Sequence, residues 1–135
     1  MVTIGKEESK MDLDQSILAN IKQMLGLTDD VTAFDNELVS HINSTFMGLN
    51  QIGVGSDDGF SIHGYDETWG QFVDDQRLAD PAREFIYMKV RLIFDPPASS
   101  VVSDALNQRI AEIEWRLNVL AEKLAAQAEE GAAEP

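Results

Sequence analysis

The residues with the clearest chemical potential in this sequence lie in one glycine-rich stretch that contains His63. The acids around this histidine are Asp57, Asp58, Asp66 and Glu67. Imidazole and carboxylate side chains are the groups that a metal ion or an acid-base reaction would use. The stretch is therefore the first place to look for a metal site or a catalytic centre.

The spacing of these residues matches no ligand template. Counting back from each glycine that could occupy position 6 of a calcium loop places no acid at position 1. Gly53 and Gly55 do not begin a dinucleotide fingerprint, because Asp58 occupies the third glycine position, and no phosphate-loop lysine follows. We favour solvated acidic surface over a metal site, and we expect no catalytic residue, metal or cofactor.

The other histidine, His41, favours a structural interpretation. It falls at the edge of an apolar helical stripe, where a histidine commonly buries its ring and keeps one nitrogen for a hydrogen bond.

Composition excludes several classes of function. Ten basic residues against twenty-four acidic ones give a formal net charge of −14, which disfavours a protein that grips nucleic acid through its phosphates. There is no cysteine for a disulfide or thiolate site, and no apolar run long enough for a membrane span or a secretory signal. We expect one soluble, unexported domain whose few basic residues pair with acids.

The polar residues 1–13 predict a flexible arm, and two helices should follow it. The first begins with Asp14 as N-cap and stops at Gly26. The second begins with Thr32 and Asp35 as a variant capping box and ends near Gly53.

A long irregular loop should cover residues 54–64, because glycines are too frequent there for a helix. A single helical turn is expected after Thr68, with Trp69, Phe72 and Val73 turned inward.

The next helix is predicted to start with Asp80 as N-cap and Pro81 at the first helical position, and to stop at 95–97. Apolar residues lie around most of its circumference, so it should be the central helix.

The last helix, capped by Ser99 or Ser100, carries a heptad-like apolar seam. The seam consists of Leu106, Ile110, Ile113, Leu117, Leu120 and Leu124. Trp115 lies on a flank of this helix, where we favour core packing over a role as an anchor to a neighbour. Residues 125–135 have almost nothing to bury and predict an acidic flexible tail. The expected fold is thus all-α, a small bundle of about four main helices within residues 14–124.

Three stretches together resemble the head-tail connector family of tailed bacteriophages with long tails (siphophages). They are residues 41–55 (HINSTFMGLNQIGVG), residues 90–97 (VRLIFDPP) and residues 112–118 (EIEWRLN), and the match runs in order from about Ile17 to Glu122. The resemblance implies a structural virion protein rather than an enzyme. It would assemble in the host cytoplasm into a ring, commonly twelve-fold, in the neck between head and tail.

In this interpretation the ring lies under the portal, extends the DNA channel and offers a docking surface to head-closure or tail-completion proteins. DNA passes through the lumen without specific binding, and no membrane is involved. The alternative that stays open is a stand-alone helical binding or regulatory module that dimerises through the heptad seam.

Ring assembly requires two different faces of the subunit to fit each other. We nominate the loop from Gly53 to Asp66 with the Trp69 segment as one face, and the last helix as the other, with its later turns docking on the portal. The candidate interface residues are Asp57, Asp58, Phe60, Trp69, Phe72, Trp115, Asn118, Leu120 and Leu124.

Overall fold

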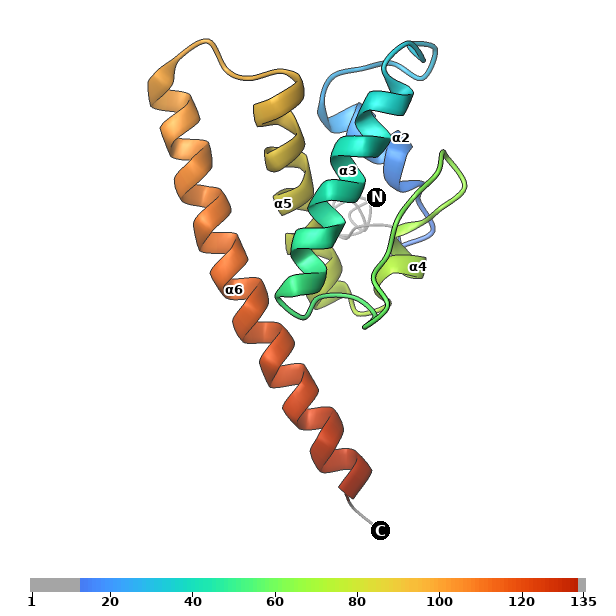
Figure 1. Cartoon of the computed structure of the whole chain (residues 1–135), viewed down its shortest axis with the longest axis vertical. Helices are drawn as coiled ribbons and strands as arrows, with labels where there is room; N and C mark the ends of the chain where they lie inside the picture. Colours follow the sequence, from blue (N-terminus) through green and yellow to red (C-terminus); the bar gives the residue numbers. More distant parts are fainter. Residues whose placement is uncertain (1–12, 134–135) are drawn as a thin grey trace, which may run out of the picture.

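The computed structural model describes residues 13–133, and within this range the chain is a helical bundle with irregular connections (Figure 1). Its elements are α2 (Ile17–Met24), α3 (Asp35–Gln51), α4 (Trp69–Phe72), α5 (Gln76–Phe94) and α6 (Ser100–Ala133). The all-α class, the long loop between the second and third main helices and the long last helix are confirmed. Of the expected N-terminal arm, only Leu13 lies within the described residues.

Helix α5 is the central element, as its apolar circumference predicted. It packs against α2, α3, α4 and α6. Its buried side chains include Phe85, Ile86, Met88 and Val90. Each large apolar side chain that leaves water in this way contributes roughly 1.5–3 kcal/mol, so α5 holds the other helices together.

Helix α2 starts two residues later than expected. Ser16, not Asp14, is its N-cap, and the Ser16 hydroxyl accepts a hydrogen bond from the Ala19 amide at 3.2 Å. Ser16 also forms an isolated antiparallel bridge with Thr68, which holds its backbone in the extended conformation that an N-cap requires. Gly26 has a φ of +83°, so the expected left-handed stop is confirmed.

Helix α3 starts at Asp35, and the predicted capping box at Thr32 is wrong. Phe34 occupies the N-cap position without a side-chain cap, while the Thr32 carbonyl accepts from the Asp35 amide in a turn before the helix. The predicted end is confirmed, because α3 finishes at Gln51 and Gly53 has a φ of +89°.

The predicted start of α5 at Asp80 was also wrong. Asp75 is the N-cap, its carboxylate accepting from the Arg77 amide at 2.9 Å, and Pro81 lies inside the helix. Pro81 removes one backbone hydrogen bond, but the turn before it is retained because Ala79 there is fully buried in the core. Tertiary packing therefore overrides the usual preference of proline for the first helical position.

The stop after α5 and the cap of α6 agree with expectation. Helix α5 ends at Phe94, and the Ser99 hydroxyl then accepts from the Val101 amide at 3.2 Å at the start of α6.

The apolar seam of α6 is buried at its centre, at Ile110, Ile113 and Leu117, where the helix packs on α5. The expected change to a tail after Leu124 does not coincide with the end of the helix, which continues to Ala133 and projects beyond the bundle (Figure 1). Side chains 125–131 are all exposed, because alanine and glutamate there have no neighbouring element to pack on.

The loop that spans residues 54–67 is attached to the bundle by specific contacts. Val54 and Ile62 are buried. The Asn43 side chain from α3 bonds both backbone groups of Ile62, donating to its carbonyl at 2.9 Å and accepting from its amide at 2.7 Å. The loop is therefore a fixed surface of the subunit.

Candidate interaction surfaces

The residues first considered for chemistry do not converge. His41 is half-buried, with its ring 3.6 Å from the Glu37 carboxylate one turn earlier on α3. His63 is exposed, and its backbone amide, not its ring, donates to Glu67 at 2.9 Å. Within residues 13–133 no three histidine or acidic side chains come close enough to hold a metal ion. Asp57, at the rim of a hollow described below, is exposed.

The glycine-rich loop nevertheless has one well-defined electrostatic feature. Partial burial would raise the pKa of Glu67, but the backbone amides of His63 and Gly64 donate to its carboxylate and lower the pKa overall. Glu67 thus closes the end of the loop as a structural acceptor.

Two of the nominated interface residues are core residues. Trp69 is fully buried and its indole N–H donates to the Asn20 side chain at 3.0 Å, while Phe72 is 5% exposed. The predicted inward orientation is confirmed, but neither side chain is open to a neighbouring subunit. The segment is buried because α4 packs directly on α5.

Phe60 forms the boundary between this core and the loop surface. It is half-buried, and its ring lies 5.1 Å from that of Phe46 and 5.6 Å from that of Phe72, measured between centroids. Asp58, two residues earlier, is exposed. The loop therefore presents its acids and the outer edge of Phe60.

Trp115 does not pack in the core, contrary to the expectation that we favoured. Its side chain is 67% exposed, because α6 uses its opposite side to pack on α5. Val119, one turn further along the helix, is 42% exposed. Together they form an outward apolar pair on α6.

The remaining candidates lie where α6 leaves the bundle. The Asn118 side chain donates to the Ile52 carbonyl at 3.1 Å and so joins α6 to the end of α3. Leu120 and Leu124 are half-buried. Since the centre of the seam is buried on α5, the alternative of a dimer formed through that seam loses its interface.

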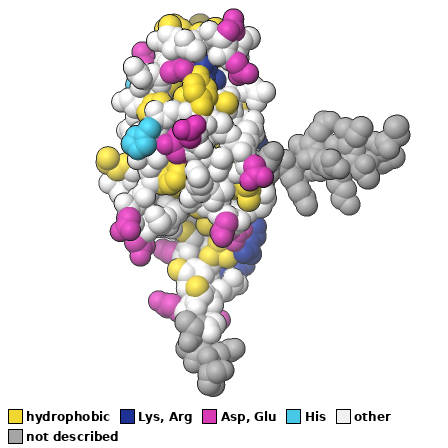
Figure 2. Space-filling view, turned by 90° about the vertical axis from the view of Figure 1, so that its right-hand side faces the viewer, with side chains coloured by type: hydrophobic (Ala, Val, Ile, Leu, Met, Phe, Trp, Pro, Cys, Tyr) yellow, Lys and Arg dark blue, Asp and Glu magenta, His cyan; other side chains and the backbone are white. Residues whose placement is uncertain are grey.

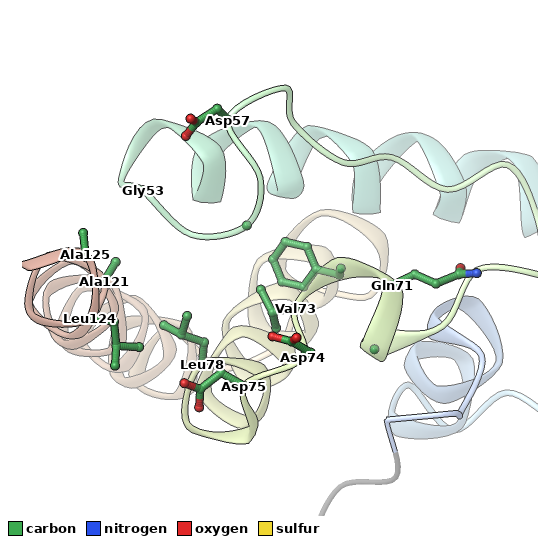
Figure 3. Close-up of a pocket in the computed structure, with 13 residues that line it drawn as sticks. Gly53, Asp57, Gln71, Val73, Asp74, Asp75, Leu78, Ala121, Leu124 and Ala125 are labelled. Atoms are coloured by element: carbon green, nitrogen blue, oxygen red, sulfur yellow. The ribbon is translucent and has the colours of Figure 1, made fainter. Parts of the chain in front are cut away.

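A hollow of about 540 Å³ lies beside this part of α6 (Figure 3). It is lined by the start of the glycine-rich loop, by α4 with its connection to the first turn of α5, and by one side of α6. Leu78 and Leu124 face each other across its lower part, with Val73 close by, and Asp57 lies on the opposite loop. We call this hollow the α6 groove.

Charge is distributed unevenly along the chain. No lysine or arginine occurs between Lys22 and Arg77, a segment that contains Asp29, Asp30, Asp35, Glu37, Asp57, Asp58, Asp66, Glu67, Asp74 and Asp75. The side formed by α2, α4 and the loop accordingly shows scattered acidic groups, with Lys and Arg mainly at its lower edge (Figure 2). The other basic residues of the described chain lie on α5 and α6.

Some of these basic residues pair with acids, as expected. Arg109 lies 3.1 Å from Glu84 and 3.3 Å from Glu112, and Arg116 lies 2.7 Å from Glu112. These pairs are exposed, so each contributes little to stability.

Sequence reasoning missed a buried charged cluster at Lys22. Its ammonium is fully buried and contacts the Val31 carbonyl at 2.5 Å, the Tyr65 hydroxyl at 2.7 Å and the Asp35 carboxylate at 3.0 Å. Tyr65 in turn donates to Asp35 at 2.5 Å. The signal was present in the sequence, since Lys22 follows Leu18 by one helical turn on the apolar stripe of α2.

Burial and pairing have opposite effects on this cluster. Desolvation alone would lower the pKa of Lys22, but the bonds from Tyr65 and Asp35 and the charge of Asp35 outweigh it and raise that pKa. Desolvation would likewise raise the pKa of Asp35, and the same partners lower it. Both groups are therefore charged at neutral pH, joining α2, α3 and the loop.

The described surface carries an outward apolar pair, a groove with acidic residues and a projecting helix. A small all-α fold with such surfaces is typical of helical assembly proteins. Comparison with family models then identifies it further. The model of the phage connector protein family matches residues 17–123, so the chain belongs to that family. Neither the comparison with curated proteins nor that with solved structures gave a match.

Membership places the chain among the structural connector proteins of phages, which are virion components and not enzymes. The family match covers α2 to most of α6 and leaves out the end of α6. None of the helices within residues 13–133 combines the length and apolarity that crossing a bilayer requires.

Proposed function

We propose that this protein forms a twelve-fold ring beneath the portal in the neck of a siphophage. The ring extends the DNA channel and provides the docking surface for head-closure or tail-completion proteins. Subunits assemble in the host cytoplasm and become part of the virion neck. The observation that carries this proposal is the connector family match over residues 17–123.

The surface of the subunit is compatible with ring assembly. A ring requires heterologous contacts, in which one patch fits a different patch on the next copy. The loop with Asp57, Asp58 and Phe60 supplies one patch, and the outward side of α6 with Trp115 supplies another. The two patches differ from each other, as the two sides of a heterologous contact do.

The end of α6 is our candidate for the portal contact. Beyond Leu124 the helix projects from the bundle with every described side chain exposed (Figure 1). An isolated helical end of this length gains little stability from its own hydrogen bonds, so a partner that packs against it would stabilise it. Asn118, Leu120 and Leu124 lie at the base of this projection.

The acidic balance of the chain suits a channel that DNA passes without binding. With a formal net charge of −14, the subunit repels the phosphate backbone, and this repulsion limits sticking. We propose no specific DNA contact. A structure of the assembled ring with a basic lumen would contradict this part of the proposal.

The test is the native mass of the full chain across a concentration series, with and without purified portal protein. We expect either a ring of about a dozen subunits, or a monomer that becomes a ring when portal is added. A dimer whose mass neither concentration nor portal changes would overturn the proposal.

A truncation tests the portal contact separately. Removing residues 126–135, which keeps Ala125 of the α6 groove, should leave the helical content of the rest intact, because the described side chains there are exposed, and should abolish portal binding. A matched control replaces Met47, a 66% exposed residue on α3, with alanine and should bind portal normally. Normal binding by the truncated chain would refute the assignment of this contact.

A further inference from the structure

We infer that the α6 groove of one subunit receives the outward apolar pair of α6, Trp115 and Val119, from the next subunit. This inference rests on the proposed ring and specifies which two surfaces of the chain meet in it. Four observations support it: exposure, the lining of the groove, charge, and the relative position of the two surfaces on α6.

The first observation is that the two side chains form one compact apolar surface. They are 67% and 42% exposed and lie one turn apart on a helix face that no other part of the described chain covers. Tryptophan is enriched among the residues that dominate binding energy in interfaces, and it gains most when a pocket desolvates it. A solvent-exposed indole beside a valine is therefore suited to insert into an apolar hollow.

The second observation is that the α6 groove is such a hollow. Its lining combines the apolar side chains of Phe72, Val73, Leu78 and Leu124 with polar ones that include Gln71 and three aspartates. Its volume of about 540 Å³ leaves room for large side chains. On the α6 side the lining consists of the small side chains of Ala121 and Ala125 and the larger one of Leu124.

The third observation is charge complementarity. The exposed acids Asp57 and Asp74 line the groove, within the segment that has no lysine or arginine. The helix face around the apolar pair carries both signs of charge, because Arg116, Lys123, Glu112 and Glu122 all lie within about 100° of Trp115 around the helix axis, and Arg116 pairs with Glu112. The acid-lined groove of one copy would therefore repel the groove of another, whereas the mixed face around the apolar pair offers bases that can face those acids.

The fourth observation concerns direction. Trp115 and Leu124 are nine residues apart, which places them on opposite sides of α6, about 180° apart around the helix axis. The donor surface and the receiving groove thus lie on opposite sides of the same helix. Such a subunit adds copies in one direction, and a constant rotation between copies closes a ring.

The chain offers a direct test because it has no cysteine. Val119→Cys places a thiol in the apolar pair, and Ala125→Cys places one in the groove. The two positions are about 9 Å apart along α6, too far for a disulfide within one chain. After mild oxidation of the full-length double variant with portal present, we expect a ladder of covalent oligomers on a denaturing gel.

The single-cysteine variants serve as matched controls, since each can form at most a covalent dimer. A dimer from Val119→Cys alone, with no ladder from the double variant, would indicate that two apolar pairs meet face to face, and would overturn the inference. The native mass of the same samples distinguishes failure of this contact from failure of the proposed ring. A ring without a ladder overturns this contact and leaves the proposed function standing, whereas a chain that forms neither overturns both.

A mixing experiment tests the direction of the contact. Trp115→Ala removes the apolar pair but keeps the groove, and Ala125→Arg fills the groove but keeps the pair. Each variant alone should need at least about tenfold more protein to assemble. Mixed together, they can make only one intact contact, so we expect a heterodimer and no ring.

The control for the mixing experiment is Met47→Ala, which removes an equally exposed apolar side chain from α3 and should assemble normally. Normal assembly of Trp115→Ala, or rings in the mixture, would overturn the inference. A third result would also overturn it: in a chain that carries both Trp115→Ala and Ala125→Cys, portal protein alone protects the thiol from modification. Portal would then be the occupant of the groove.

Discussion

Replacing the buried Lys22 with methionine should destabilise the fold more than any change at an exposed lysine. Methionine fills a similar volume but removes the ammonium, so Asp35 keeps its charge and loses its counter-ion. Breaking a buried ion pair at one partner costs roughly 3–5 kcal/mol. The Asp35 side chain is 20% exposed and keeps the Tyr65 hydrogen bond, so we expect the lower end, about 3 kcal/mol.

Urea unfolding followed by far-ultraviolet circular dichroism measures this difference. With a slope of about 1.5 kcal/mol per molar urea, the midpoint of Lys22→Met should fall by about 2 M. Lys123→Met, at an exposed position of α6, is the matched control and should leave the midpoint unchanged. A loss below about 1 kcal/mol for Lys22→Met would refute the argument, because it would mean that the cluster is not coupled to folding.

The difference in stability between wild type and Lys22→Met should depend on pH. The pKa of Asp35 is lowered on folding, so its contribution is present above the ordinary carboxyl range and is lost as the pH falls through the folded value. The pKa of Lys22 is raised, so its contribution persists through neutral pH and is lost only at strongly alkaline pH. The stability gap between wild type and Lys22→Met should therefore narrow below about pH 4; a gap that stays constant in acid would contradict this.

Two further pairs of substitutions test the core and the loop. Gly55→Ala should lower the free energy of unfolding by about 2–3 kcal/mol, because φ there is +95° and an added Cβ would lie 2.9 Å from the Phe72 ring. Gly59→Ala should lower it by only about 1 kcal/mol in the same urea assay, because φ is similar, at +86°, but no atom lies within 4 Å of the added Cβ. Equal losses would show that the ring moves aside. Trp69→Phe should cost about 1–3 kcal/mol by leaving the buried partner of its indole N–H unsatisfied, and Trp115→Phe should change the unfolding midpoint very little. The reverse order would contradict the assigned burial.

Apolar periodicity predicted the helices because it reflects which side of each element must leave water. The stripe of Leu38, Ile42 and Phe46, the stop after Phe94 and the left-handed Gly26 were all evident in local sequence. Helix starts were less predictable, because several capping residues compete within a few positions. At α2 the bridge between Ser16 and Thr68 decides the start, and that contact is invisible locally.

The surfaces were harder to predict than the fold. Whether Trp115 is covered depends on how α6 is rotated on α5. Trp115 lies two residues from both Ile113 and Leu117 of the seam, and this spacing is compatible with a covered or an exposed side chain. The prediction that Trp69 turns inward was correct, but Trp69 was also nominated for an interface. Its full burial could not be predicted locally, because its hydrogen-bond partner Asn20 is 49 residues away in sequence. Long-range packing, not composition, decides which aromatic residues remain on the surface.

The opposite environments of the two tryptophans make the protein its own optical reporter. Trp69, enclosed and hydrogen-bonded, should emit at short wavelength and resist an added quencher until the chain unfolds. Trp115 should emit at long wavelength and be quenched freely by the same additive. In the Trp69→Phe variant any blue shift would come from Trp115 alone, so association of subunits could be followed in real time without a label.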